Sequence, residues 1–167
     1  MRSRGFTLVE LLLVVGIVAL LAAVGMPSYA DLSARQRLAA ASEQLAAELQ
    51  QARFDAVQGG RDMHVSLRGG PQWCYAVSLA PGCDCQQPAA TTPAACALRR
   101  GDAQAHPDVQ LTTERTHAVF DARMGRAAPG VVARLSVGER SAEVQLTPSG
   151  RARACGRGAD LPGLPRC

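Results

Sequence analysis

One uninterrupted apolar segment near the start of the chain constrains its structure more than any other feature. Residues 6–26 read FTLVELLLVVGIVALLAAVGM, and as an α-helix these 21 residues span about 30 Å, the thickness of a bilayer's hydrocarbon core. Residues 1–5 are polar and carry Arg2 and Arg4, and basic flanks stay on the cytoplasmic side. We therefore expect one membrane-spanning helix over residues 6–27, with all later residues outside the cytoplasm.

A carboxylate inside this segment separates it from an ordinary secretory signal, which also has a basic start and an apolar run. Glu10 lies five residues after Gly5, and an ionisable side chain in such a segment is costly unless it finds a partner. Its presence indicates a helix that is retained for a function.

The string Gly5-Phe6-Thr7-Leu8-Val9-Glu10, followed by a long apolar helix, resembles the class III leader of type IV pilins and type II secretion pseudopilins. The resemblance implies that a prepilin peptidase removes residues 1–5 by cutting after Gly5, and that the new Phe6 amine is N-methylated. It also implies that Glu10 meets the N-terminal ammonium of a neighbouring pilin in a filament. Pairing would relieve two charges that both lack solvent.

The next segment, residues 28–60, has the pattern of an amphipathic helix that continues into a globular head. Pro27 should kink the helix or loosen one turn. Apolar residues then recur at helical spacing, and Gly59-Gly60 ends the helix. These apolar residues are Leu38, Leu45, Leu49, Ala52 and Ala56.

After Arg61 the apolar period changes to two, which is typical of strands. The expected strands lie near 63–67, 73–77, 109–111, 118–120, 131–137 and 144–146. The fold class is therefore α+β and type IV pilin-like, with a long N-terminal helix packed on an antiparallel β-sheet. Residues 61–167 form the β-rich head, and residues 150–167 form an Arg-rich tail.

All six cysteines lie in the head, whose core is too small to be very stable alone. They are Cys74, Cys83, Cys85, Cys96, Cys155 and Cys167. This distribution favours disulfides in an oxidising compartment over a zinc site or free thiols, because the 83-x-85 spacing is not that of common zinc knuckles. We expect no metal, although a metal site can be drawn from Cys83, Cys85, Cys96 and His106.

Two disulfide arrangements are open for the last two cysteines. A bridge between Cys155 and Cys167 would close a small loop, whereas Cys155 alternatively reaches back to the head and Cys167 pairs elsewhere. The segment 81–95 is rich in Pro, Ala and Thr and reads as a loop. The loop is bracketed by Cys83, Cys85 and Cys96, which suggests that disulfide bonds restrain it.

Positive charge is concentrated at the C-terminal end. All 18 basic residues are arginines, and residues 150–167 hold four of them against one acid, Asp160, which gives +3. Arg151 and Arg153 project to one side of an extended segment, while Gly150 allows a positive φ or a close backbone approach. Two arginines on one side of a strand form a plausible phosphate clamp that Arg157 extends.

Residues 120–155 resemble the C-terminal region of the FimT/GspH group of minor pilins, and Gly150-Arg151-Ala152-Arg153 matches a Gly-Arg-x-Arg signature of FimT proteins. The resemblance implies binding of extracellular double-stranded DNA during natural transformation. No aromatic residues interleave with these arginines, so we expect weak sequence preference and little base stacking.

Two alternatives remain: a purely structural minor pilin that primes filament assembly, and a type II secretion pseudopilin. An enzyme is not expected, since His64, His106 and His117 have no neighbouring nucleophile motif and no glycine-rich phosphate loop is present. No cofactor is expected either. The expected location is the inner membrane with a periplasmic head, and afterwards the extracellular filament.

Overall fold

The structure is a computed structural model that describes residues 7–86, 98–158 and 161–167. Within these ranges the chain forms one helix, α1 (Leu8–Gly59), and nine strands. The strands are β1 (Met63–Arg68), β2 (Cys74–Ser78), β3 (Arg99–Asp102), β4 (Gln110–Thr113), β5 (His117–Phe120), β6 (Ala127–Ala128), β7 (Val131–Val137), β8 (Arg140–Leu146) and β9 (Ala152–Arg157). The chain divides into two compact units, residues 1–34 and residues 35–167.

The first unit contains the apolar part of α1. Thr7 caps this helix, because its hydroxyl oxygen accepts a hydrogen bond from the backbone N–H of Glu10 at 3.3 Å. Large apolar side chains such as Leu12 and Leu20 are more than half exposed, and α1 is long and apolar enough to cross a membrane. The helix runs unbroken through position 27, so the proline there does not end it.

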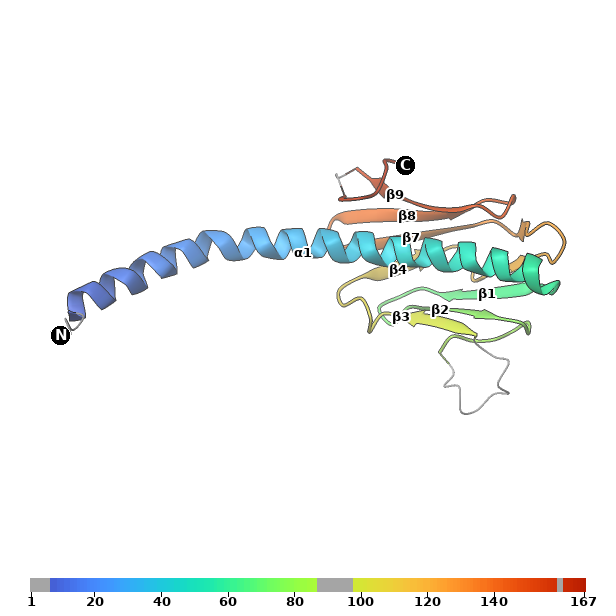
Figure 1. Cartoon of the computed structure of the whole chain (residues 1–167), viewed down its shortest axis with the longest axis horizontal. Coiled ribbons are helices and arrows are strands. Elements are labelled where there is room, and N and C mark those ends of the chain that lie inside the picture. The colour runs from blue at the N-terminus through green and yellow to red at the C-terminus, as the bar shows by residue number, and fades with distance from the viewer. Residues whose placement is uncertain (1–6, 87–97, 159–160) are drawn as a thin grey trace, which may run out of the picture. The chain divides into compact units, whose positions relative to one another are not determined.

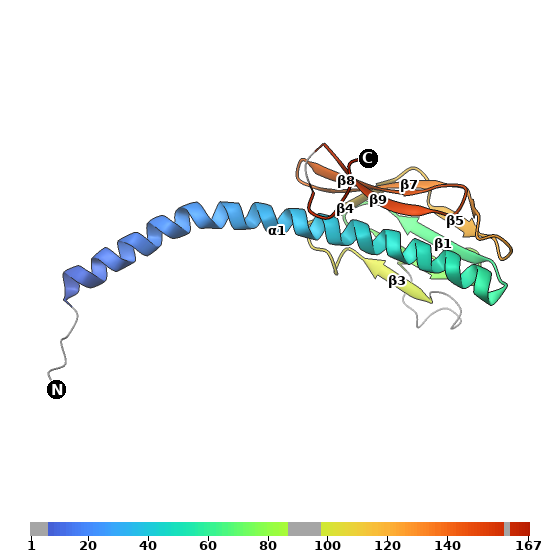
Figure 2. The ribbon, with the colours of Figure 1, turned by 45° about the horizontal axis from the view of Figure 1, so that its top comes forward.

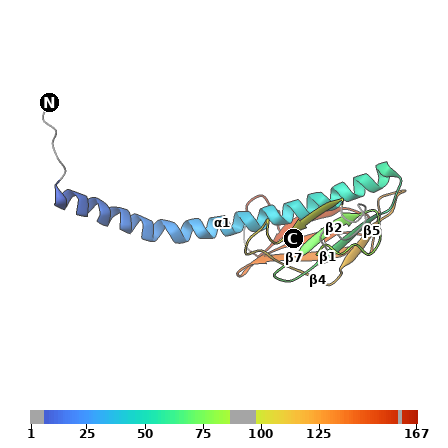
Figure 3. The ribbon, with the colours of Figure 1, turned by 90° about the horizontal axis from the view of Figure 1, so that it is seen from below.

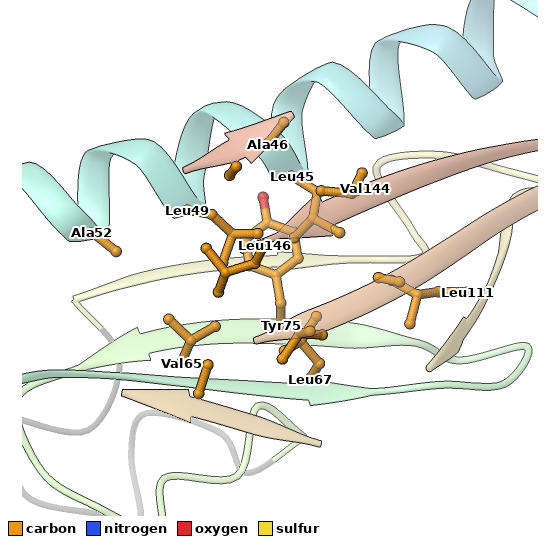
Figure 4. Close-up of a cluster of buried hydrophobic side chains, with 14 of the residues drawn as sticks. Leu45, Ala46, Leu49, Ala52, Val65, Leu67, Tyr75, Leu111, Val144 and Leu146 are labelled. Atoms are coloured by element: carbon orange, nitrogen blue, oxygen red, sulfur yellow. The ribbon is translucent and has the colours of Figure 1, made fainter. Parts of the chain in front are cut away.

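The second unit, which we call the head, is built on the buried stripe of α1. The predicted residues Leu38, Leu45, Leu49, Ala52 and Ala56 are all at most 2% exposed. In Figure 4, Leu45 and Leu49 point from the helix toward Tyr75 and Leu146 on the strands. Burial of this apolar stripe stabilises the head by roughly 1.5–3 kcal/mol per large side chain.

The strands form two antiparallel sheets that share one helix. The five-stranded sheet has the order β3-β2-β1-β5-β6, and the four-stranded sheet has the order β4-β7-β8-β9. An isolated bridge between Gly70, which follows β1, and Leu111 of β4 connects the two sheets. In the head, α1 lies along one side of the strands, with β7–β9 and β1–β3 on either side of its path (Figures 1 and 3). The long helix on antiparallel sheet was predicted correctly.

The predicted alternation of β2 is wrong. All five of its residues are buried, although an alternating strand would expose Cys74 and Ala76. The second face is covered because the disulfide Cys74–Cys85, with Cα atoms 5.7 Å apart, holds the following loop against it. Cys83 is also disulfide-bonded, so neither Cys83 nor Cys85 is available as a metal ligand. Cys96 lies outside the described residues.

The Arg-rich tail, residues 150–167, packs closely on the rest of the head over its described residues. Residues 152–157 form β9, which pairs along its whole length with residues 141–146 of β8. The chain then returns so that Gly156 donates to the carbonyl of Pro165 at 2.8 Å and accepts from Cys167 at 3.1 Å. A disulfide joins Cys155 to Cys167, and Leu161 is only 4% exposed. The C-terminal segment is therefore part of the head.

Candidate nucleic-acid interface

Arg151, the first of the predicted arginines, ends a tight turn at residues 147–151, and Arg153 follows it in β9. The backbone N–H of Gly150 donates to the carbonyl of Thr147 at 2.8 Å, and the N–H of Thr147 donates to the carbonyl of Arg151 at 2.9 Å. The Thr147 hydroxyl also donates to the Arg151 carbonyl at 3.1 Å. This network fixes the backbone at Arg151, so the arginine extends from a rigid support.

Gly150 has a positive φ of 81°, which favours glycine, and its backbone lies against another part of the head. A β-carbon at this position would overlap the carbonyl oxygen of Gly125 and would lie 3.2 Å from Cδ of Arg53. A β-carbon on Gly125 would in turn lie 2.7 Å from Cγ of Arg53. The two glycines thus leave room for the aliphatic part of Arg53.

These elements enclose a groove of about 760 Å³ between α1 and the start of β9. The helix contributes one face, with residues spaced i, i+3, i+4 and i+7, and the turn with β9 contributes the other. The amide of Gln50 connects the two walls by donating to the Ala152 carbonyl at 2.8 Å, and α1 and β9 lie side by side in Figure 2. The lining residues are Gln50, Arg53, Phe54, Val57, Thr147, Ser149, Gly150, Arg151, Ala152 and Arg153.

We call this the arginine groove, because Arg53, Arg151 and Arg153 line it. No carboxylate among the described residues forms an ion pair with any of the three. Several arginines elsewhere in the head form ion pairs: Arg37 with Asp108, Arg68 with Asp84, Arg99 with Glu48 and Asp55, and Arg100 with Asp102. The arginine groove therefore gathers positive charge that the head does not neutralise.

Arg157 differs from the other predicted arginines. Its guanidinium donates to Glu143 at 2.8 Å, and Arg134 donates to the same oxygen at 3.0 Å. Burial pushes the pKa of Glu143 upward, but hydrogen bonds from Arg134 and Gln145 and the charge of Arg157 bring the pKa below its ordinary value. Arg153, which also lines the arginine groove, donates to the side-chain oxygen of Gln145 at 3.4 Å. An ionised Glu143 therefore offsets part of the charge of Arg157.

Sequence reasoning missed the helix side of this groove. The helical pattern identifies only the buried apolar stripe and gives neither Arg53 nor Phe54 a role. Phe54 is 53% exposed in the groove beside Arg151 and Arg153. No local sequence signal identifies these two residues, since about a hundred positions separate them from the arginines that they join.

The residues predicted for filament assembly lie elsewhere. Glu10 is exposed in the first turn of α1. Gly5 and Phe6 lie outside the described residues. A carboxylate in the first turn of a helix interacts favourably with the helix dipole.

The histidines have ordinary structural surroundings. His106 stacks on Trp73 with ring centroids 6.1 Å apart and lies 2.8 Å from the side-chain oxygen of Gln44. His64 and His117 lie on the neighbouring strands β1 and β5. No group of three or more His, Cys, Asp or Glu residues in the described ranges is arranged to hold a metal ion.

A long helix with an apolar N-terminal part, packed on antiparallel sheets through its second half, defines the class of type IV pilin-like proteins. The sequence model of the type II transport protein GspH matches residues 41–150, and that of the prokaryotic N-terminal methylation motif matches residues 1–26. The chain belongs to the GspH family, which comprises minor pilins and pseudopilins. Proteins of this family are structural rather than enzymatic.

Similar proteins agree with this assignment. A fimbrial protein of Pseudomonas aeruginosa is 38% identical over 61 residues, which cover 36% of this chain and 39% of that protein. The prepilin peptidase-dependent protein D of Escherichia coli K12 is 57% identical over 28 residues, covering 17% of this chain and 19% of that protein. The first match therefore spans well under half of its relative's length.

The fold matches a solved minor pilin. The crystal structure of the type IV minor pilin FimU of Pseudomonas aeruginosa PAO1 superimposes with a TM-score of 0.57 at 21% identity, covering 75% of this chain and 96% of FimU. A second crystal form gives a TM-score of 0.53 at 18% identity, covering 73% and 98%. At these identities the likeness establishes the fold. The particular resemblance to FimT stays a prediction.

Proposed function

We propose that this chain is a minor type IV pilin whose head binds double-stranded DNA without sequence preference, in support of DNA uptake during natural transformation. The observation that carries the proposal is the set of three arginines in one groove that have no carboxylate partner in the described part of the chain. Guanidinium groups pair with phosphate oxygens in a fork geometry, and phosphate contacts supply most nonspecific affinity for DNA.

The predicted residues have different shares in this proposal. Arg151 and Arg153 contact phosphates. Arg157 contributes less, because Glu143 already accepts from it. Gly150 acts through the backbone, since it lets the turn before β9 lie against Gly125 and Arg53.

The N-terminal segment supports the part of this proposal that concerns the protein's location in the cell. The methylation motif over residues 1–26 and the apolar helix fit membrane anchoring, processing by prepilin peptidase and association with other pilins. We infer that cleavage follows Gly5, that Phe6 is methylated, and that Glu10 pairs with a neighbour's amine. The head would lie in the periplasm and later on the extracellular filament.

The test is a titration of full-length protein in detergent micelles with labelled duplex DNA at several salt concentrations. The double variant Arg151→Gln/Arg153→Gln should bind every duplex more weakly, and its log-affinity against log-salt slope should be flatter by about two. The matched control is Arg115→Gln/Arg123→Gln, which removes two exposed arginines, on either side of β5, that form no ion pair with a described residue. Wild-type affinity and slope in the first variant would overturn the proposal.

A second candidate function has its own support. The GspH match is to a type II transport protein and ends at residue 150, one residue before Arg151. A structural minor pilin or pseudopilin that primes filament assembly therefore needs none of the arginines of β9. In that case both double variants would bind DNA equally and would assemble normally into filaments.

A further inference from the structure

Phe54 lies on the same helix face as two other groove residues. Gln50, Phe54 and Val57 are spaced i, i+4 and i+7, and Arg53 lies beside them. Neighbouring stripe residues Leu49, Ala52 and Ala56 are at most 2% exposed, whereas Phe54 is 53% exposed. The aromatic ring is therefore presented to the groove and not to the core.

We propose that the arginine groove binds an unpaired DNA base, which stacks on Phe54 while Arg53, Arg151 and Arg153 hold the flanking phosphates. This inference rests on the proposed function and gives it a second ligand class, single-stranded DNA. It also revises the expectation that base stacking makes little contribution, which considered only aromatics near the arginines in sequence.

The chemistry of the groove favours a nucleotide over a purely apolar ligand. Proteins that bind single strands without sequence preference combine a cationic groove with an aromatic platform. Here one aromatic ring lies among three arginines that have no carboxylate partner among the described residues. A volume of about 760 Å³ is within the range of small-ligand pockets, and it exceeds the space that one base occupies.

The two walls are held in a fixed relation, which a stacking site requires. Gln50 bonds to the carbonyl of Ala152 at 2.8 Å across the groove. Gly125 and Gly150 confine the stem of Arg53 from the other side. The ring and the guanidinium groups are thus arranged before a ligand arrives, which reduces the entropy lost on binding.

The experiment measures fluorescence anisotropy of the full chain in detergent micelles with three labelled probes of equal length. These are a single strand, a blunt duplex, and a single strand with abasic sites at its centre. The variants are Phe54→Ala, Phe54→Trp and the control Val132→Ala, which truncates a side chain that is 51% exposed on β7. Thermal melting confirms that each variant folds.

Phe54→Ala should weaken single-strand binding by about 5- to 150-fold, which is the range of one base–aromatic stacking contact. Its duplex affinity should change by less than about twofold, and its salt slope should equal that of wild type, since no phosphate contact is lost. Wild type should bind the abasic strand as weakly as Phe54→Ala binds the intact single strand. Val132→Ala should behave as wild type.

Phe54→Trp supplies a direct readout of stacking. The only native tryptophan, Trp73, is 1% exposed, so an indole at position 54 would dominate changes in fluorescence. Addition of the single strand should quench this signal, and the abasic strand should not.

The outcomes separate the two proposals. Equal single-strand affinity of Phe54→Ala and wild type overturns stacking, even where Arg151→Gln/Arg153→Gln still abolishes duplex binding. If the arginine variant binds both probes normally, the DNA-binding function fails as a whole. If Phe54→Ala affects only recovery in filaments, the groove binds a neighbouring subunit and this inference is wrong.

Discussion

A β-carbon on Gly150 would overlap the carbonyl oxygen of Gly125, so these two turns of the head meet in direct backbone contact. Gly150 is separated from Gly125 by strands β6, β7 and β8. Their contact sets the position of the turn that precedes the arginines of β9. The glycine of the Gly-Arg-x-Arg signature therefore has a packing role in this head.

Gly150→Ala should destabilise the head through both the positive φ and the overlap. Gly138→Ala is the matched control, because Gly138 has a φ of 57° but open space around its α-carbon. The control should lose about 1 kcal/mol from the free energy of unfolding, and Gly150→Ala about 1–3 kcal/mol more. Chemical denaturation measures both, and equal losses would contradict the contact.

Glu143 should make the stability of the head depend on pH. Its pKa is lower in the folded state than in the unfolded state. The stabilisation is therefore fully present above the unfolded value of about 4.3 and is lost as the pH falls through the folded value. Glu143→Gln should lose stability at neutral pH and show a shallower decline below about pH 4.5.

The control for this pH experiment is Glu139→Gln in the turn between β7 and β8, where the carboxylate forms no ion pair with a described residue. This variant should follow the wild-type curve when unfolding free energy is measured across the acid range. A Glu143→Gln profile parallel to wild type would show that the two arginines do not stabilise the carboxylate.

Removal of the Cys155–Cys167 bridge should loosen the C-terminal segment. The two cysteines are 12 residues apart, and closing such a loop stabilises the folded state by roughly 3 kcal/mol. Cys155→Ser/Cys167→Ser should therefore melt at a lower temperature and should lose amide-exchange protection at Gly156. Cys74→Ser/Cys85→Ser should lower the melting temperature while protection at Gly156 persists. Unchanged protection in the first variant would contradict the role of the bridge.

Glu10→Ala should insert in the membrane normally but enter filaments poorly. Loss of the acid makes the segment more apolar, so insertion does not suffer, whereas the partner for a neighbour's amine is gone. Recovery in sheared filament fractions, normalised to expression, measures the effect. Wild-type recovery would exclude the pairing role.

Gly5→Ala should leave the leader attached, because the resemblance to prepilins implies that the peptidase requires glycine before the cut. Mass spectrometry of membrane-extracted wild-type protein should show a methylated start at Phe6. An intact Met1 in wild type would be inconsistent with processing.

The general architecture was predictable because its signals are local. The apolar run, Glu10 and the helical stripe from Leu38 to Ala56 each lie within one continuous segment. Strands β1, β5 and β7 have alternating apolar residues, so their period identified them. The long β8 was found only over its apolar second half.

The missed strands lack such signals. Strand β3 reads RRGD, and it is held because Arg99 reaches back to Glu48 at 2.7 Å and to Asp55 on α1. Strand β9 reads ARACGR, with alanine as its only aliphatic side chain, so its composition suggested an exposed tail. Pairing with β8 and the disulfide to Cys167 fix it, and both depend on residues distant in sequence.

The candidate site was half predictable. The sequence identifies Arg151 and Arg153 as a charged pair, but only the fold shows that neither forms an ion pair with a described carboxylate. Arg53 and Phe54 became part of the groove only through the packing of α1 beside β9.

The way the chain covers β9 has a consequence for heads that are crowded together. β9 is an edge strand of the four-stranded sheet. The unpaired backbone groups of an edge strand readily form hydrogen bonds with a strand of another molecule. Here the amide of Gln50 occupies the Ala152 carbonyl, and the segment ending at Cys167 occupies both backbone groups of Gly156. Backbone groups near both ends of β9 are thereby bonded within one subunit. Heads held side by side along a fibre can then associate through their side chains without fusing into a continuous intermolecular sheet.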